Sequence, residues 1–285
     1  MIKIKKLLSK KDKSKIVCLT AYSKNVASIL DNHCDIILVG DSLGSVLYNF
    51  KSTRNVSLDM MIEHSKSVRM GVKKSLMIVD MPHNTYRNKS VALKNAKKII
   101  LKTKCDAVKL EGGGKVINII EHLIKNKIQV QGHLGLLPQS QKGKFKVKGK
   151  KISEQLRILN DAKLLEKAGV FSIVLECIKT PLAKKITNEL KILTIGIGAS
   201  SYCDGQVLVT DDLIGLNQIN ARFGYKAISK IKILQADIGF INKEEKVTNK
   251  NILENSKTFL SDELHDNELR LVMRKFELSR KILPS

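Results

Sequence analysis

Short runs of apolar, mostly β-branched residues alternate with helical stretches along the first two thirds of the chain. The runs are apolar throughout, which is typical of parallel strands that are covered on both faces. Repeated strand–helix units of this size fold either into a doubly wound open sheet or into a closed (β/α)8 barrel. The expected strands cover residues 16–20, 35–40, 75–80, 106–111, 128–133, 171–176 and 192–197, with a weaker eighth strand near 213–216.

Helical patterns fill the spaces between these runs. Ser57 and Ser90 stand where helix N-caps are expected, and Pro181 suits a first helical turn. The chain begins with a basic segment that lacks the apolar core of a secretory signal, so we expect an ordinary amphipathic helix there. The other expected helices cover residues 23–31, 57–70, 90–104, 115–126, 151–168 and 181–190.

Ionisable residues stand at the carboxyl ends of at least four successive expected strands. This pattern favours the barrel, because a barrel builds its site from many strand ends whereas a doubly wound sheet gathers its ligands at one switch point. Burying a charge without a partner is costly, so such residues are expected to be paired, bound to a metal, or both. The residues in question are Asp41, Asp80, Lys109, Glu111 and Glu176.

Three of these residues are carboxylates on three successive strands: Asp41, Asp80 and Glu111. Oxygen ligands in that number suit Mg²⁺, which keeps positions open for water and substrate. Lys109 and Glu111 are two residues apart and therefore point to the same side of their strand. Mg²⁺ beside a lysine would hold a 2-oxo acid and stabilise the charge of its enolate. A single aspartate here could equally be a cap or turn residue, and Lys109 with Glu111 a structural ion pair.

Forming an enolate also needs a base that removes a proton from carbon. Glu176 ends an apolar strand, where a carboxylate is well placed for that role. His133 has two interpretations that stay open: it binds substrate or orients a ligand, or it is a satisfied structural histidine. Four other histidines stand in helical or polar contexts and are not expected to be catalytic, namely His33, His64, His122 and His265.

The chain is strongly basic, with 51 Lys and Arg against 27 Asp and Glu and a formal net charge of +24. Such a charge would fit a nucleic-acid binder. The excess is mostly lysine spread along the whole chain, without interleaved aromatics, so we expect no nucleic-acid partner. None of the five cysteines forms a C-x-x-C pair, which predicts reduced thiols and no zinc site. No apolar run approaches the length of a membrane span, and we expect no membrane partner.

Two segments depart from the strand–helix pattern. Residues 141–151 carry lysine at every second position, which predicts a short extended hairpin or loop that is either a solvated edge or a flap facing an anion. Residues 242–285 are first strongly polar and then helical, so we expect one barrel domain over residues 1–285 with 242–285 as a C-terminal extension. An apolar stripe there predicts packing onto the body or onto a neighbouring subunit, through Leu269, Val272, Met273 and Phe276.

Several motifs together resemble the ketopantoate hydroxymethyltransferase family, in order and in spacing, over about residues 5–216. They include VGDSLG, VDMP, AVKLEGG, GHLGLLPQ, VLEC and IGIGAS followed by CDGQVLV. The sequence departs from the family's pattern at Ser23, at His83 and beyond Gly215.

The resemblance implies a (β/α)8 barrel that transfers a hydroxymethyl group from 5,10-methylenetetrahydrofolate to 3-methyl-2-oxobutanoate. The product would be 2-dehydropantoate, in the first step of pantothenate and coenzyme A biosynthesis. It also implies a cytoplasmic homo-oligomer, commonly a decamer, with a 2-oxo acid and a folate as small-molecule partners. The implied site has Mg²⁺ bound by Asp41, Asp80 and Glu111, substrate contacts from Asp41, Ser42, Asp80 and Lys109, and Glu176 as the proton acceptor.

Two other functions stay open at this point. One is a different Mg²⁺-dependent barrel that forms an enolate, a lyase of the isocitrate-lyase type. Such lyases use a cysteine loop that this sequence lacks. The other is a decayed relative that acts as a basic binding protein, against which the intact acids and Lys109 argue, because charges are costly to bury without a function.

Overall fold

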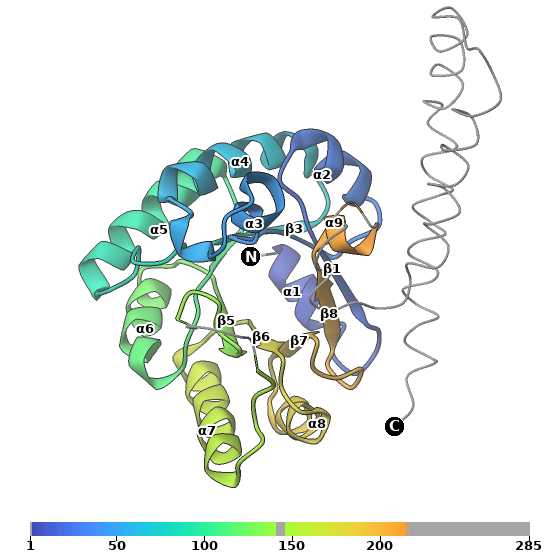
Figure 1. Ribbon diagram of the computed structural model, residues 1–285, viewed down its shortest axis with the longest axis vertical. Helices are drawn as coiled ribbons and strands as arrows, with labels where there is room; N and C mark the ends of the chain where they lie inside the picture. The colour runs from blue at the N-terminus through green and yellow to red at the C-terminus, as the bar shows by residue number, and fades with distance from the viewer. Residues whose placement is uncertain (1, 141–145, 215, 217–285) are drawn as a thin grey trace, which may run out of the picture. The chain divides into compact units, whose positions relative to one another are not determined.

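Eight parallel strands close into a barrel in the order in which they occur along the chain (Figure 1). The computed structural model describes residues 2–140, 146–214 and 216. The predicted (β/α)8 barrel is therefore confirmed, and the doubly wound sheet is excluded. The strands are β1 (Ile16–Thr20), β2 (Ile36–Val39), β3 (Leu76–Asp80), β4 (Ala107–Lys109), β5 (Val130–Gly135), β6 (Ser172–Glu176), β7 (Leu193–Ile197) and β8 (Gly205–Leu208).

The prediction of the eighth strand near 213–216 is wrong, because β8 comes earlier in the chain. Residues 198–204 join β7 to β8 without an intervening helix, so the regular strand–helix spacing breaks down here. Residues of β8 alternate between buried and half-buried, whereas the residues of the other strands are almost all buried. Leu213 instead ends the short helix α9 (Thr210–Leu213).

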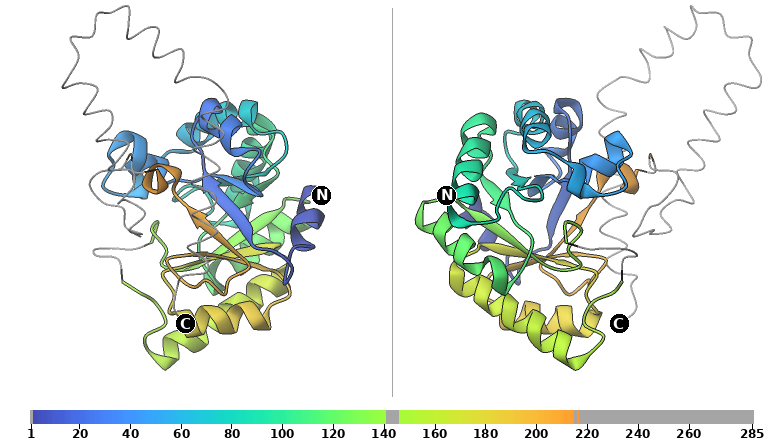
Figure 2. Two further views of the ribbon diagram at one scale, coloured as in Figure 1. Left: turned by 90° about the vertical axis from the view of Figure 1, so that its right-hand side faces the viewer. Right: turned by 60° about the vertical axis from the view of Figure 1, so that its left-hand side comes forward.

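The helices predicted between the strands are confirmed, and those from α4 to α8 lie outside the barrel (Figures 1 and 2). Ser57 caps α4 by accepting the N–H of Met60, and Pro181 stands in the first turn of α8. The prediction for Ser90 is wrong, because Asn88 caps α5 by accepting the N–H of Val91. The helices are α2 (Lys24–Leu30), α3 (Leu43–Tyr48), which was not predicted, α4 (Leu58–Gly71), α5 (Lys89–Thr103), α6 (Ile117–Lys125), α7 (Ile152–Ala168) and α8 (Thr180–Glu189).

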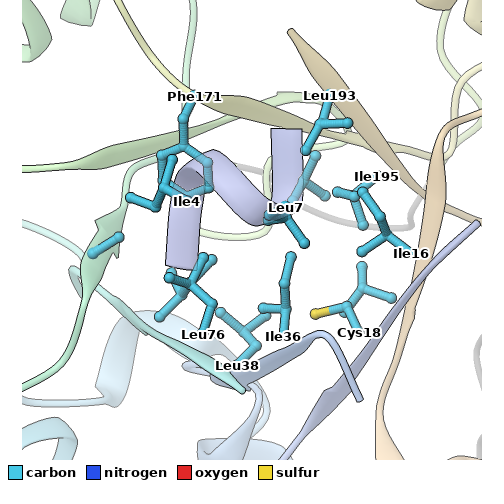
Figure 3. Packing of buried hydrophobic residues seen from close by; sticks show 14 residues of the cluster. Ile4, Leu7, Ile16, Cys18, Ile36, Leu38, Leu76, Phe171, Leu193 and Ile195 are labelled. Carbon is cyan, nitrogen blue, oxygen red and sulfur yellow. The ribbon is translucent and has the colours of Figure 1, made fainter. Parts of the chain in front are cut away.

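The expected amphipathic helix at the start of the chain is α1 (Ile2–Leu8), which packs against the interior of the barrel. Figure 3 shows Ile4 and Leu7 of this helix among side chains from several strands. Both residues belong to one buried cluster with Ile16, Leu76 and Leu193, which stand at or near the beginnings of their strands. The amino-terminal end of the barrel is therefore filled with apolar side chains, and the carboxyl-terminal end is left for polar chemistry.

The chain separates into two units, Met1–Val209 and Thr210–Ser285, and the barrel lies in the first. The expected extension at 242–285, with its apolar stripe, lies outside the described residues. In the part of the chain that the structure describes, no helix is long and apolar enough to cross a membrane.

Candidate active site

Asp80 and Lys109 form a buried ion pair where β3 and β4 end, with 2.7 Å between Asp80 Oδ1 and Lys109 Nζ. The register of the barrel sets these two residues directly beside each other on adjacent strands. Asp80 Oδ2 also accepts the backbone N–H of Asp41 at 3.1 Å. A Cβ at Gly40 would come within 2.9 Å of Ser42 Oγ and 3.5 Å of Asp80 Oδ2, so a larger residue at this turn would displace the Ser42 hydroxyl.

The charges of these residues strongly influence one another. Burial, followed by the charges of Asp80 and Glu111, raises the pKa of Asp41 well above its usual range. Burial alone would lower the pKa of Lys109, but the surrounding carboxylates outweigh it and raise that pKa. Lys109 is therefore a cation at neutral pH, and it faces more negative charge than it can neutralise.

His133 lies between two carboxylates inside the barrel. Its Nε2 is 3.1 Å from Glu176 Oε2, and its Nδ1 is 3.6 Å from Glu111 Oε1. Neither contact has the geometry of a hydrogen bond, so both are ionic contacts. Burial opposes the charged form, but the two carboxylates raise the pKa of His133 to about 9, and the ring is therefore an imidazolium at neutral pH.

Glu176 is the last residue of β6 and is almost fully buried. Gly135 of β5 lies beside it with φ +97°, and a Cβ there would be 2.1 Å from the Glu176 carbonyl oxygen. Cys177, the next residue, has φ 51°, a conformation that is uncommon outside glycine. The backbone around Glu176 is therefore closely constrained.

Ser42 follows Asp41 and is half-buried, and its Oγ lies 2.8 Å from the hydroxyl of Tyr22. The structure thus brings the residues predicted for the site to the carboxyl ends of strands β2 to β6. Asp41, Asp80 and Lys109 form one connected group, and Glu111, His133 and Glu176 form a second.

Gln139 and Tyr86 connect to this site and were missed from the sequence. The Gln139 amide donates to Asp41 Oδ2 at 2.8 Å, and its backbone N–H donates to Glu111 Oε2 at 3.0 Å. Tyr86 donates its hydroxyl to Gln139 Oε1 at 2.6 Å. The only sequence signal for Gln139 was its place at the end of the motif GHLGLLPQ.

Part of the lysine-rich segment 141–151 runs beside the residues that follow Glu176. The N–H of Lys148 donates to the Cys177 carbonyl at 2.7 Å, and the N–H of Lys179 donates to the Lys148 carbonyl at 3.1 Å. Lys146 and Lys150 are exposed, and residues 141–145 lie outside the described part of the chain. Both interpretations of this segment, a solvated edge and an anion-facing flap, therefore stay open.

The fit of a divalent cation can be judged from the donor set. Among the described residues, no three His, Cys, Asp or Glu side chains are arranged to hold a metal ion by themselves. Mg²⁺, however, is usually held by one or two carboxylates, with waters and substrate completing its coordination. Four buried carboxylates here face one lysine and one histidine. Burial and the neighbouring carboxylates together raise the pKa of Asp41, and a bound cation would offset both effects. The chemistry of the site therefore fits Mg²⁺.

A closed barrel with acids and a lysine at the carboxyl ends of its strands defines an enzyme of the (β/α)8 class. The sequence profile of the ketopantoate hydroxymethyltransferase family matches residues 1–238. The chain therefore belongs to the ketopantoate hydroxymethyltransferase family and is a transferase.

Individual relatives agree with this assignment. The 3-methyl-2-oxobutanoate hydroxymethyltransferase of Pelagibacter ubique (strain HTCC1062) is 73% identical over 221 residues, covering 78% of this chain and 86% of that protein. The protein of the same name from Anaplasma marginale (strain St. Maries) is 48% identical over 225 residues, covering 78% and 81%. A crystal structure of phosphonopyruvate hydrolase with oxalate and Mg²⁺ has a TM-score of 0.59 at 12% identity, covering 97% of this chain and 99% of that one. At that identity the likeness concerns the fold alone.

Proposed function

We propose that this transferase moves a hydroxymethyl group from 5,10-methylenetetrahydrofolate to 3-methyl-2-oxobutanoate and so forms 2-dehydropantoate. The observation that carries the proposal is the buried Asp80–Lys109 ion pair beside Asp41 and Glu111, in a chain whose relatives bear the name of this reaction. A 2-oxo acid carries a carboxylate and a keto oxygen, and a site with the cationic Lys109 beside a cation-binding set of acids matches both groups.

The assignment of binding roles follows from charge. Asp41, Asp80 and Glu111 would hold Mg²⁺ either directly or through its bound waters, and the bound ion would supply a Lewis acid for the keto oxygen. Lys109 neutralises negative charge on the 2-oxo acid. Ser42, whose hydroxyl Tyr22 holds at 2.8 Å, contributes a hydrogen bond to the same substrate.

The proton at C3 of the oxo acid needs a base, and we assign that role to Glu176. The His133 ring lies 3.1 Å from Glu176 Oε2, so this ionic contact fixes the position of the carboxylate beside the substrate. His133 is therefore assigned a supporting role. The buried position of both side chains excludes bulk water from the proton transfer.

Exchange of the C3 proton in deuterated water tests this proposal. We expect 3-methyl-2-oxobutanoate to incorporate deuterium when enzyme and Mg²⁺ are both present, and not when Mg²⁺ is removed by EDTA. Folded protein that gives no exchange with Mg²⁺ present contradicts the proposed mechanism. Product analysis with and without methylenetetrahydrofolate then separates transfer from the lyase alternative, since a lyase would not need the folate.

We also propose that the protein is a cytoplasmic homo-oligomer. The proposal is supported by the family to which the chain belongs and by the resemblance of its motifs to members that are commonly decamers. Analytical ultracentrifugation of the full chain tests it, and a sedimentation coefficient of a 31.9 kDa monomer at micromolar concentration would contradict it.

A further inference from the structure

Gln139 lies after β5 and is only 1% exposed, and it contacts carboxylates from two different strand ends. Its Nε2 donates to Asp41 Oδ2 at 2.8 Å and to the Met81 carbonyl oxygen at 3.0 Å. Its backbone N–H donates to Glu111 Oε2 at 3.0 Å. One residue therefore restrains two of the acids that the proposed function assigns to the metal.

The orientation of the Gln139 amide follows from the chemistry of its neighbours. A carboxylate and a carbonyl oxygen only accept hydrogen bonds, so the NH₂ group must face Asp41 and Met81. The amide oxygen then faces Tyr86, whose hydroxyl donates to it at 2.6 Å. Burial and the charge of Glu111 raise the pKa of Tyr86, so its hydroxyl keeps the proton that it donates. A directed chain of hydrogen bonds thus leads from Tyr86 through Gln139 to Asp41.

A neutral donor suits this position better than a charged one. A lysine or arginine would also donate to Asp41, but it would cancel the negative charge that attracts a divalent cation. An amide holds the carboxylate through one oxygen, Oδ2, without adding charge. Outer partners of this kind fix the orientation of metal-binding side chains, and their loss typically lowers metal affinity or activity 10–100-fold.

We propose that Gln139 is a positioning residue that holds Asp41 and Glu111 in the arrangement that binds the divalent cation. This inference rests on the proposed function. Metal affinity would then depend on the Gln139 side chain, which does not itself bind the metal. Tyr86 in turn holds the Gln139 amide in place.

Binding of Mn²⁺, followed by electron paramagnetic resonance of the free ion, tests the inference without any catalytic assay. Gln139→Met keeps similar length and the backbone N–H but removes the amide donor. We expect the Mn²⁺ dissociation constant to rise by about 10–100-fold. Gln206→Met is the matched control, because the Gln206 amide donates to the Ser200 carbonyl and not to a carboxylate. It should bind Mn²⁺ like the wild type.

A second readout separates positioning from general damage. In the proton-exchange assay, Gln139→Met should need more Mg²⁺ for half-maximal rate and should recover much of the rate at saturating Mg²⁺. A loss that no Mg²⁺ concentration reverses, together with unchanged Mn²⁺ affinity, overturns the inference.

Tyr86→Phe decides the question if Gln139→Met does not fold. It removes only the hydroxyl that orients the amide, so we expect a smaller rise in the Mn²⁺ dissociation constant, of a few fold. Wild-type affinity in Tyr86→Phe would then overturn the inference. If the wild type exchanges the proton and binds Mn²⁺, and the folded variants bind Mn²⁺ with the same affinity as the wild type, only the proposed role of Gln139 is wrong. If the wild type does neither, the proposed function fails.

Discussion

His133 Nε2 lies 3.1 Å from Glu176 Oε2, and so a buried imidazolium stands directly beside the proposed base. On the other side of the ring, Glu111 belongs to the proposed metal site. His133 therefore connects the group that would take a proton with the group that would bind the cation.

Glu176→Gln should abolish most proton exchange while leaving the fold intact. Glutamine has nearly the same shape but cannot accept a proton, and loss of a general base typically costs about 10²–10⁴-fold in rate. The rate of deuterium incorporation at C3 of 3-methyl-2-oxobutanoate measures this effect. Mn²⁺ binding is the control, and it should change little because Glu176 is not assigned to the metal. An unchanged exchange rate would show that another group is the base.

The stability of the metal-free protein should fall as the pH rises through the range set by His133. Its pKa is raised to about 9 in the folded protein, above the ~6.5 of an unfolded histidine. The folded state therefore binds the proton more tightly, so this stabilisation is complete below pH ~6.5 and is lost as the pH rises through about 9. We expect a loss on the order of 1–3 kcal/mol.

Urea unfolding of the EDTA-treated protein at several pH values between about 6 and about 10 measures this dependence. His133→Gln is the comparison, because it removes the titrating group at the same buried position. Its unfolding free energy should vary less with pH than that of the wild type. Equal slopes in the two proteins would contradict the role of His133.

The sequence allowed most of the barrel and most residues of the candidate site to be predicted, for identifiable reasons. Apolar runs locate strands that are buried on both faces, and the first seven strands overlap their predicted ranges. Residues such as Asp80 and Glu176 were identified because a charge at the end of an apolar run is conspicuous. β8 was misplaced because its residues are only alternately buried and no helix separates it from β7.

Gln139 could not be assigned from the sequence, because its partners are remote along the chain. It contacts Asp41, 98 residues away, and Met81, 58 residues away. A glutamine after an apolar run carries no charge that would mark it as costly to bury. Only the closure of the barrel brings these segments together, so the network of Gln139 and Tyr86 became visible in the structure alone.

Lys109→Met should destabilise the protein strongly. It leaves Asp80 buried without its cation, and breaking a buried ion pair typically costs about 3–5 kcal/mol. Lys98→Met is the control, because Lys98 pairs with Asp59 at 2.8 Å on the exposed surface, where water screens the interaction and such pairs contribute little to stability. Urea unfolding of both variants measures the difference. Mg²⁺ should restore part of the stability lost in Lys109→Met, since a cation beside Asp80 replaces some of the missing charge. Equal effects at Lys98 and Lys109 would contradict this account.

Leu7→Ala tests whether α1 fills the amino-terminal end of the barrel. Leu7 is 4% exposed and packs with Ile16 and Leu193, so its truncation leaves a cavity that typically costs about 2–5 kcal/mol. Ile2→Ala on the same helix is the matched control, because Ile2 is 86% exposed and its truncation should stay within about 0.5 kcal/mol. Both values come from urea unfolding followed by circular dichroism. Leu7 stands at the opposite end of the barrel from Asp41 and Glu176, so folded Leu7→Ala should keep the wild-type Mg²⁺ requirement in the exchange assay. A cost below about 1 kcal/mol for Leu7→Ala would mean that α1 is not part of the core.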